Sequence, residues 1–268
     1  VARRPIVDRA FSDRRDAAKL RVFLLTSEAS MGKAIIVGAS SGIGWELAIQ
    51  LADAGYQLGL MARREDLLNE LVEQLPGEHW VQCSDVTECE HAQAQLQGLI
   101  ERMDGVDMVV LNSGVGFLEG RLEWENQRTI IDVNVRGFCA LAVVAMQHFE
   151  ATGKGHLVGI SSLAAHISGA SMPTYHASKA FVSSYLNGLR GRVDRRRVPI
   201  TVTVVEPGFV RTPMVLGSPP WMAPVDRAVR QIMVAIVRKK NHVYITRRWR
   251  LVAWLAYLTP TAMLAKRF

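Results

Sequence analysis

A glycine-rich turn at residues 38–44, with the sequence GASSGIG, follows the short apolar segment Ala34–Val37 and precedes a segment of helical spacing, Trp45–Ala54. Glycine permits backbone conformations and close approaches that other residues do not. Backbone N–H groups at the start of a helix, together with the helix dipole, attract an anion. The order of strand, glycine turn and helix therefore predicts a phosphate-binding turn at the edge of a parallel sheet.

Apolar segments and segments of helical periodicity alternate from Lys33 onward. The apolar segments are short and continuous, as expected of strands that are buried on both faces of a sheet. Repeated strand–helix units predict an α/β fold, a doubly wound parallel sheet of the Rossmann type with six to seven strands and helices on both faces. The expected strands are Ala34–Val37, Gln57–Met61, Trp80–Cys83, Met108–Leu111, His156–Ile160, Ile200–Val205 and, as a seventh, His242–Ile245; the expected helices are Trp45–Ala54, Asp66–Leu75, Glu88–Met103, Glu123–Phe149, Thr174–Arg195 and Val225–Val237.

The positive charge of the chain lies at its two ends. The whole chain has a net charge of +7, of which residues 1–30 carry +3 and residues 238–268 carry +8, which leaves −4 for residues 31–237. A basic protein often binds nucleic acid. Because the central part is mildly acidic, we expect no nucleic-acid partner, and the basic ends point to an anionic membrane surface instead.

Tyr175 and Lys179 are four residues apart in a segment of helical spacing, so their side chains lie on one helical face. A free tyrosine has a pKa near ~10 and exchanges protons poorly at neutral pH. A neighbouring ammonium stabilises the phenolate, so we expect Lys179 to lower the pKa of Tyr175. Ser162, which lies 13 residues before Tyr175, can donate a hydrogen bond to a substrate oxygen. A Y-x-x-x-K pair alone is usually a surface pair, but together with the glycine turn it predicts proton transfer beside a bound nucleotide.

These motifs occur with several others between Lys33 and Met214, and in this order they resemble the short-chain dehydrogenase/reductase family, in its compact, non-extended branch. The resemblance implies hydride transfer between a nicotinamide dinucleotide and a carbonyl or alcohol carbon, while Tyr175 moves the proton. The family more often has alanine at the position of Ser113. The matching residues are Gly38, Gly42, Gly44, Asp85-Val86, Asn112-Ser113-Gly114, Asn134, Ser162, Tyr175, Lys179, Pro207-Gly208 and Thr212.

The resemblance also implies a role for each residue. Asn134, Ser162, Tyr175 and Lys179 are the implied catalytic residues, and Asn134 supports the lysine through a water. The residues implied to bind the cofactor are Gly38, Ser40, Ser41, Gly42, Ile43, Gly44, Arg63, Asp85, Val86, Asn112, Ser113, Gly114, Tyr175, Lys179, Pro207, Gly208, Val210 and Thr212.

No acid stands at the end of the second expected strand, where residues 60–64 read LMARR. An acid at this position would bind the ribose 2′-hydroxyl of NAD, whereas an arginine would accept the 2′-phosphate of NADP. A guanidinium can hold a phosphate with two hydrogen bonds. We therefore expect Arg63 to favour NADP(H) over NAD(H); the alternative is that Arg63 and Arg64 are solvated residues at a helix start.

Residues 214–222 are apolar and rich in Met, Pro and Trp, and by the resemblance they form the lid over the substrate. Such a lid suits a hydrophobic carbonyl or alcohol substrate. It could equally be a lid that packs on its own core.

Residues 247–258 combine arginines with Trp and Tyr, the composition of a helix that lies in a membrane interface. The apolar stretch is far shorter than the ~20 residues needed to span a bilayer, and Pro260 is expected to end it. The alternative is a helix that docks on a partner subunit, since family members commonly form homodimers or tetramers.

Three parts of the chain are expected. Residues 1–30 are either a disordered arm or an artefact of the start site, because Met31 stands directly before the first strand. Residues 31–246 are the expected dinucleotide-binding catalytic domain, and residues 247–268 a basic, aromatic, amphipathic tail. We expect a cytoplasmic protein, with peripheral attachment to the inner face of a membrane as an option.

Neither a metal site nor a disulfide framework is expected. The three cysteines, Cys83, Cys89 and Cys139, form no CxxC pair, and such cysteine usage fits a reducing compartment. His166 and His176 flank the expected site without metal-ligand spacing to Cys, Asp or Glu. The alternative to an enzyme is a nucleotide-binding regulatory or sensor protein with little turnover.

Overall fold

The computed structural model describes residues 32–118, 121–215, 217 and 219–258. The predicted arm at residues 1–30 and the part of the predicted tail beyond residue 258 lie outside these residues, as do Leu216 and Ser218 of the predicted lid.

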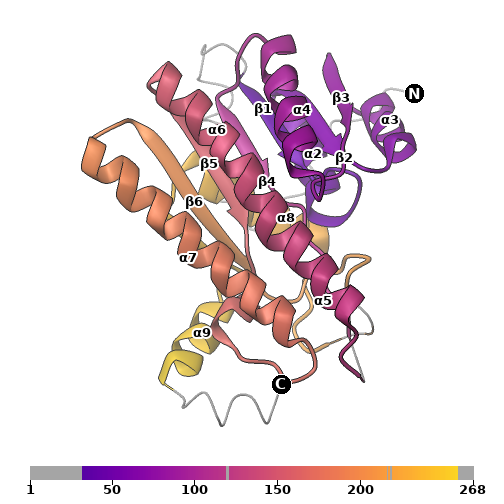
Figure 1. Ribbon diagram of the computed structural model, residues 1–268, viewed down its shortest axis with the longest axis vertical. Coiled ribbons are helices and arrows are strands. Elements are labelled where there is room, and N and C mark those ends of the chain that lie inside the picture. The colour runs from indigo at the N-terminus through magenta and orange to yellow at the C-terminus, as the bar shows by residue number, and fades with distance from the viewer. Residues whose placement is uncertain (1–31, 119–120, 216, 218, 259–268) are drawn as a thin grey trace.

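Seven parallel strands form one central sheet in the order β3-β2-β1-β4-β5-β6-β7 (Figure 1). The predicted α/β fold of the Rossmann type is therefore confirmed, including its seventh strand. The chain builds outward from β1 to β3, returns to the other side of β1 with β4, and continues outward to β7. The strands are β1 (Lys33–Val37), β2 (Gln57–Ala62), β3 (His79–Cys83), β4 (Met108–Leu111), β5 (Gly155–Ile160), β6 (Ile200–Pro207) and β7 (His242–Ile245).

Each face of the sheet has its own hydrophobic core. One core is formed with α4, α6 and α7, and the other with α2, α3 and α8 (Figure 1). The strands are buried on both faces because helices cover both, which explains their continuous apolar sequences. The helices are α2 (Gly42–Asp53), α3 (Glu65–Gln74), α4 (Cys89–Arg102), α5 (Trp124–Ile131), α6 (Phe138–Thr152), α7 (Pro173–Arg196), α8 (Val225–Val237) and α9 (Trp249–Leu258).

The long helical segment predicted at Glu123–Phe149 is one continuous helix of 29 residues, from Trp124 to Thr152. It contains a π-helical stretch, η2 (Asp132–Gly137), between α5 and α6. The helix is long and apolar enough to cross a membrane by length and composition, yet 56% of its apolar window is buried inside the protein. We therefore interpret it as a core helix.

His156 on β5 is a buried ionisable group of the core. It is 7% exposed, and its Nε2 atom lies 2.8 Å from the hydroxyl of Thr203 on β6. Burial lowers the pKa of His156 to about 4, and the charge of Lys239 lowers it further. The ring is therefore kept neutral by the fold.

This histidine should make the protein sensitive to acid. The unfolded chain, with a histidine pKa of ~6.5, binds more protons than the folded chain between pH ~6.5 and ~4, so stability is full above this window and falls as the pH falls through it. The loss should approach ~3 kcal/mol. Thermal unfolding measured across this range should show a smaller decline for His156→Asn than for the wild type. Equal declines would show that other groups cause the loss of stability at low pH.

Candidate active site

The carboxyl ends of the central strands open into a cleft with a volume of about 410 Å³, at the point where the strand order reverses between β1 and β4. Ligands of open α/β sheets bind at such a reversal. Gly44, Asp85 and Asn134 are not among the residues that line the cleft. The predicted site residues that line the cleft are Gly38, Ser40, Ser41, Gly42, Ile43, Arg63, Val86, Asn112, Ser113, Gly114, Ser162, Tyr175, Lys179, Pro207, Gly208, Val210 and Thr212.

The glycine turn has the geometry that its sequence requires. Gly38 and Gly42 have φ values of +86° and +59°, in the left-handed region that favours glycine. A Cβ atom at Gly44 would overlap the carbonyl oxygen of Gly38, which accepts a hydrogen bond of 2.8 Å from Nδ2 of Asn112. The turn therefore packs tightly on α2 and β4 and leaves the first turn of α2 open to the cleft, which fits a pyrophosphate.

Two arginines face this turn from the end of β2. Arg63 lies with its Nη1 atom 3.6 Å from Oδ2 of Asp85. Arg64 donates hydrogen bonds to the hydroxyls of Ser40, at 2.9 Å, and Ser41, at 2.8 Å. Arg64 is exposed at the start of α3, as the alternative expects, and it also binds the glycine turn. The sequence analysis missed Arg64 as a site residue, although its place beside Arg63 was a signal.

Helix α7 brings Tyr175 and Lys179 to the wall of the cleft. The Nζ atom of Lys179 lies 5.8 Å from the centroid of the Tyr175 ring. It donates a hydrogen bond of 3.2 Å to the carbonyl oxygen of Ile160 at the end of β5, and the lysine is 4% exposed. A Cβ atom at Gly114 would lie 3.2 Å from Nζ, so this glycine allows the ammonium to reach the cleft.

The protonation of this pair differs from our expectation. Burial raises the pKa of the Tyr175 phenol, and the hydrogen bond with Ser162 lowers it only in part. Burial also lowers the pKa of Lys179 to about 8. The expectation that Lys179 lowers the tyrosine pKa is therefore wrong: burial raises this pKa, and the hydrogen bond with Ser162 is what opposes the rise.

Ser162 begins the short 3₁₀ helix η3 (Leu163–His166). Its hydroxyl accepts a hydrogen bond of 3.1 Å from the Ala164 amide and lies 3.4 Å from the carbonyl oxygen of Pro207, to which it donates. These contacts hold the hydroxyl at the cleft between β5 and β6. From there it reaches the phenol of Tyr175.

Asn134 lies in the π-helical stretch η2 and is 1% exposed. Its side chain exchanges two hydrogen bonds of 2.9 Å with the backbone of Val115, and its Nδ2 atom donates one of 3.0 Å to Ser178. The asparagine thus ties the loop after β4 to α7. A π-helical stretch is common at functional sites, and here it turns Asn134 toward the helix that carries Tyr175 and Lys179.

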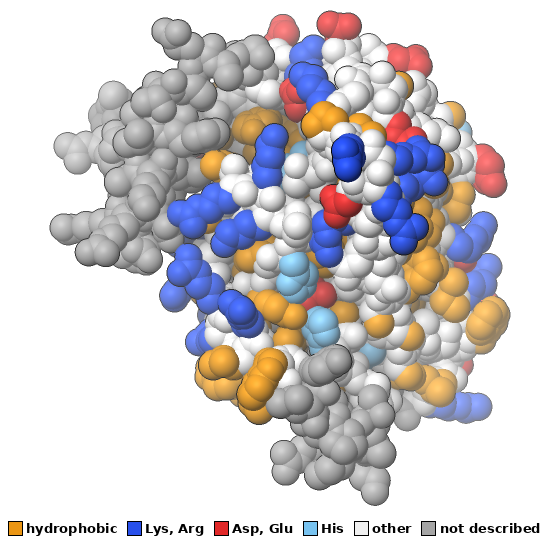
Figure 2. Space-filling view, turned by 90° about the vertical axis from the view of Figure 1, so that its left-hand side faces the viewer, with side chains coloured by type: hydrophobic (Ala, Val, Ile, Leu, Met, Phe, Trp, Pro, Cys, Tyr) orange, Lys and Arg blue, Asp and Glu red, His pale blue; other side chains and the backbone are white. Residues whose placement is uncertain are grey.

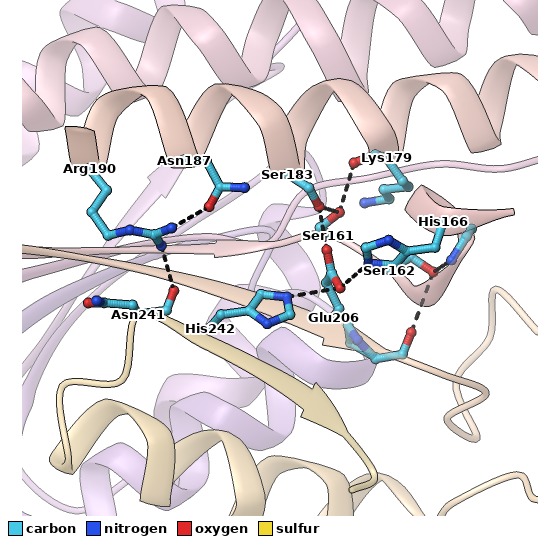
Figure 3. A network of polar contacts seen from close by, with 12 residues as sticks. Ser161, Ser162, His166, Lys179, Ser183, Asn187, Arg190, Glu206, Asn241 and His242 are labelled. Atoms are coloured by element: carbon cyan, nitrogen blue, oxygen red, sulfur yellow. Dashed lines mark hydrogen bonds and ion pairs between the residues drawn. The ribbon is translucent and has the colours of Figure 1, made fainter. Parts of the chain in front are cut away.

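A buried acid, which the sequence analysis missed, accepts a hydrogen bond from the same helix, α7. Figure 3 shows Glu206 between His166 and His242, whose Nε2 atoms lie 2.6 Å and 2.9 Å from its Oε2 atom. Ser183 on α7 donates to the other carboxylate oxygen at 2.7 Å. Burial raises the pKa of Glu206, but the hydrogen bonds from the histidines and Ser183 lower it to about 2. The signal for this group was an acid within the apolar strand 200–207.

The donor atoms of His166, Glu206 and His242 lie within 4.8 Å of one another, so these three residues could in principle hold a metal ion. The Nε2 atom of each histidine already contacts the carboxylate of Glu206. Sequence spacing could not reveal this cluster, because its members come from η3, β6 and β7.

Exposed apolar side chains stand among the cleft-lining residues 207–215 or follow them in the chain. Phe209, Met214 and Trp221 are 44%, 45% and 56% exposed. Trp249, the first residue of α9, contacts the rings of Phe209 and Trp221 with centroid distances of 5.7 Å and 5.4 Å. A Cβ atom at Gly208 would overlap the Trp249 indole. The described part of the predicted tail therefore packs directly on the cleft.

The same architecture occurs in known proteins. The family model for short chain dehydrogenase matches residues 32–223. An uncharacterized oxidoreductase from Myxococcus xanthus is 35% identical over 225 residues, which cover 79% of this chain and 86% of that protein. The 11-beta-hydroxysteroid dehydrogenase A of Sesamum indicum is 27% identical over 266 residues, covering 89% and 75%. A short chain dehydrogenase/reductase from Burkholderia phymatum, solved in complex with NAD, superposes with a TM-score of 0.77 at 21% identity and covers 84% of this chain and 92% of that one.

The family match extends from the first strand to the bridge between Val210 and Ala223, so it includes the whole cleft. Members of the matched family are oxidoreductases that bind NAD(P)(H). With the nucleotide turn, the parallel sheet and the strand order in place, the chain belongs to the short-chain dehydrogenase/reductase family of oxidoreductases.

Proposed function

We propose that the protein is an NADP(H)-dependent oxidoreductase that interconverts a secondary alcohol and a ketone or an aldehyde, with a lipophilic substrate. The observation that carries this proposal is the approach of Tyr175, Lys179 and Ser162 to one another in a cleft that begins at the glycine turn. The sensor alternative gains no support, since a protein that only binds a nucleotide has no need of this set.

The residues of the cleft fit a dinucleotide. The glycine turn and the N-terminus of α2 would hold the pyrophosphate, and Lys179 the nicotinamide ribose. The cofactor, when bound, supplies or accepts the hydride at the substrate carbon. In the reducing direction Ser162 donates a hydrogen bond to the carbonyl oxygen and Tyr175 gives this oxygen its proton; in the oxidising direction Tyr175 takes the proton back.

The preference for NADP(H) is supported by the two arginines at the end of β2. Arg63 and Arg64 both line the cleft, and no acid ends the strand, whose last residue is Ala62. Guanidinium groups beside Ser40 and Ser41 offer several donors to a 2′-phosphate. An NAD-selective site would place a carboxylate here.

The lipophilic substrate is supported by the exposed apolar rim at Phe209, Met214 and Trp221. A relative named for a hydroxysteroid agrees with it. Exposed Ile131, Val143 and Phe181 on the helices α5, α6 and α7 support a homodimer or tetramer. A cytoplasmic location remains part of the proposal.

Turnover of NADPH with a panel of ketones tests the proposal. We expect lipophilic ketones to be reduced with a higher kcat/KM than short-chain ketones of equal reactivity, because only the former fill the apolar rim. If the protein binds NADPH but consumes no carbonyl of either kind, the sensor alternative replaces the enzyme.

A further inference from the structure

A second pocket, larger than the cleft, lies at the outer edge of the sheet between α8, β7 and the start of α9. Its volume is about 1020 Å³. The residues that line it include six arginines and lysines and no Asp or Glu: Arg227, Arg230, Lys240, Arg247, Arg248 and Arg250. The proposed oxidoreductase chemistry uses none of them.

The described residues that line the pocket include no carboxylate to balance this charge. Asp226 pairs with Arg230 at 2.7 Å, and Arg248 donates a hydrogen bond of 2.6 Å to the carbonyl oxygen of Trp221. The carboxylate of Glu206 is already shared by His166 and His242. Figure 2 looks onto this side of the molecule and shows Lys and Arg side chains gathered near histidines and hydrophobic side chains. The pocket therefore favours an anion and opposes a divalent cation at the nearby histidines.

Two polar side chains of the pocket also lack a partner in the described structure. Thr246 is only 8% exposed, and its hydroxyl makes no hydrogen bond. The buried Oε1 atom of Gln231 on α8 makes none either. Buried polar groups are nearly always hydrogen-bonded, so unpaired groups in a pocket indicate a missing ligand. A hydroxyl that can donate and an amide oxygen that can accept suit a phosphate group that carries a hydroxylated alcohol.

An exposed apolar helix face adjoins the pocket. Arg250 lines the pocket, and Leu251, Trp254 and Leu255 follow on the same face of α9 with exposures of 67%, 60% and 55%. The opposite face, with Trp249 and Ala253, is buried against Leu163. Cationic residues next to exposed Trp and Leu are typical of a helix that lies in a bilayer interface.

We propose that this pocket binds the phosphate headgroup of an anionic phospholipid, while the exposed face of α9 enters the interface of the same bilayer. Charge complementarity favours this occupant over the ends of the chain itself, since residues 1–30 are net positive and residues 259–268 add Lys266 and Arg267 without an acid. The proposal thus adds a specific headgroup site to the membrane contact that the composition of residues 247–258 predicts. The proposal does not depend on turnover.

Sedimentation with vesicles tests the proposal on the full-length protein. It should bind phosphatidylcholine vesicles that contain phosphatidylglycerol, bind pure phosphatidylcholine vesicles weakly, and lose binding as salt rises through ~0.1 M and above. Each basic residue near an anionic surface contributes about fivefold to binding. The double variant Arg227→Glu, Arg250→Glu should therefore bind at least ~25-fold more weakly, and Trp254→Ser should also weaken binding.

A matched control changes charge elsewhere. Arg102→Glu with Arg195→Glu alters two exposed arginines on α4 and α7 that do not line the pocket, and should bind vesicles like the wild type. Both double variants should keep the wild-type melting temperature and turnover of a soluble ketone. If the control loses as much binding as the pocket variant, net charge rather than the pocket is responsible and the proposal fails.

Further outcomes would overturn the assignment to a bilayer. Equal binding to vesicles with and without phosphatidylglycerol would show that the pocket does not bind an anionic headgroup. A protein that binds inorganic phosphate in calorimetry, yet ignores all vesicles, would have a site for a soluble anion. A pocket variant that changes from dimer to monomer in light scattering, with no effect on vesicles, would assign the face to a second copy of the chain.

Discussion

Replacing Tyr175 with phenylalanine should lower kcat/KM for carbonyl reduction by ~10²- to 10⁴-fold, the usual contribution of a positioned general acid. The ring would stay in place, because its edge-on contact with His176, at a centroid distance of 6.1 Å, does not involve the hydroxyl. NADPH affinity, measured by fluorescence titration, should therefore remain close to that of the wild type. Steady-state kinetics measure the loss.

A second tyrosine on the same helix provides the control. Tyr185 is half-buried on α7 and contacts Phe138 and Phe181 through its ring. Tyr185→Phe removes a hydroxyl of the same kind outside the cleft, so turnover should be unchanged. The proposed proton transfer would be refuted if Tyr175→Phe kept full activity, or if both variants lost activity equally.

Removing both arginines at the end of β2, with Arg63→Ala and Arg64→Ala combined, should lower kcat/KM with NADPH by at least ~10²-fold. A hydrogen bond to a charged group is worth ~1.5–3 kcal/mol, about 10- to 150-fold for each arginine. Activity with NADH should change little, since NADH lacks the 2′-phosphate. The ratio of the two kcat/KM values is the measurement.

The single variants separate the two arginines. Arg64 also holds Ser40 and Ser41 of the glycine turn, so Arg64→Ala tests the turn as well as the phosphate. Activity with NADH reports on the turn alone. A parallel loss with NADH and NADPH would mean that the arginines shape the turn and do not select the cofactor. Arg102→Ala, on the exposed side of α4, is the matched control.

The sheet could be predicted from the sequence because buried parallel strands have continuous apolar sequences and the helices between them have a clear period. The turn at 38–44 could be predicted because only glycine tolerates the backbone conformation of Gly38 and the close packing at Gly44. In these segments local sequence and final structure agree. The order of the strands in the sheet was not predicted from the sequence; the structure supplies it.

The remaining features arise from long-range contacts that no local pattern encodes. Glu206 meets His166 and His242 only because β5, β6 and β7 are neighbours in the sheet. The π-helical turn at Asp132–Gly137 lies within an unbroken helical period. The pKa of Tyr175 depends on how deeply the fold buries the phenol, which spacing to Lys179 cannot reveal.

The buried ammonium of Lys179 affects more than chemistry. With a pKa of about 8, this buried group is still charged at neutral pH, and the desolvation of that charge lowers the stability of the native chain. A nucleotide that binds only the native chain shifts the folding equilibrium by mass action. Proteases act on the transiently opened population. We therefore expect the half-life of each copy in the cell to follow the supply of dinucleotide, so that starvation for the coenzyme would clear the enzyme itself.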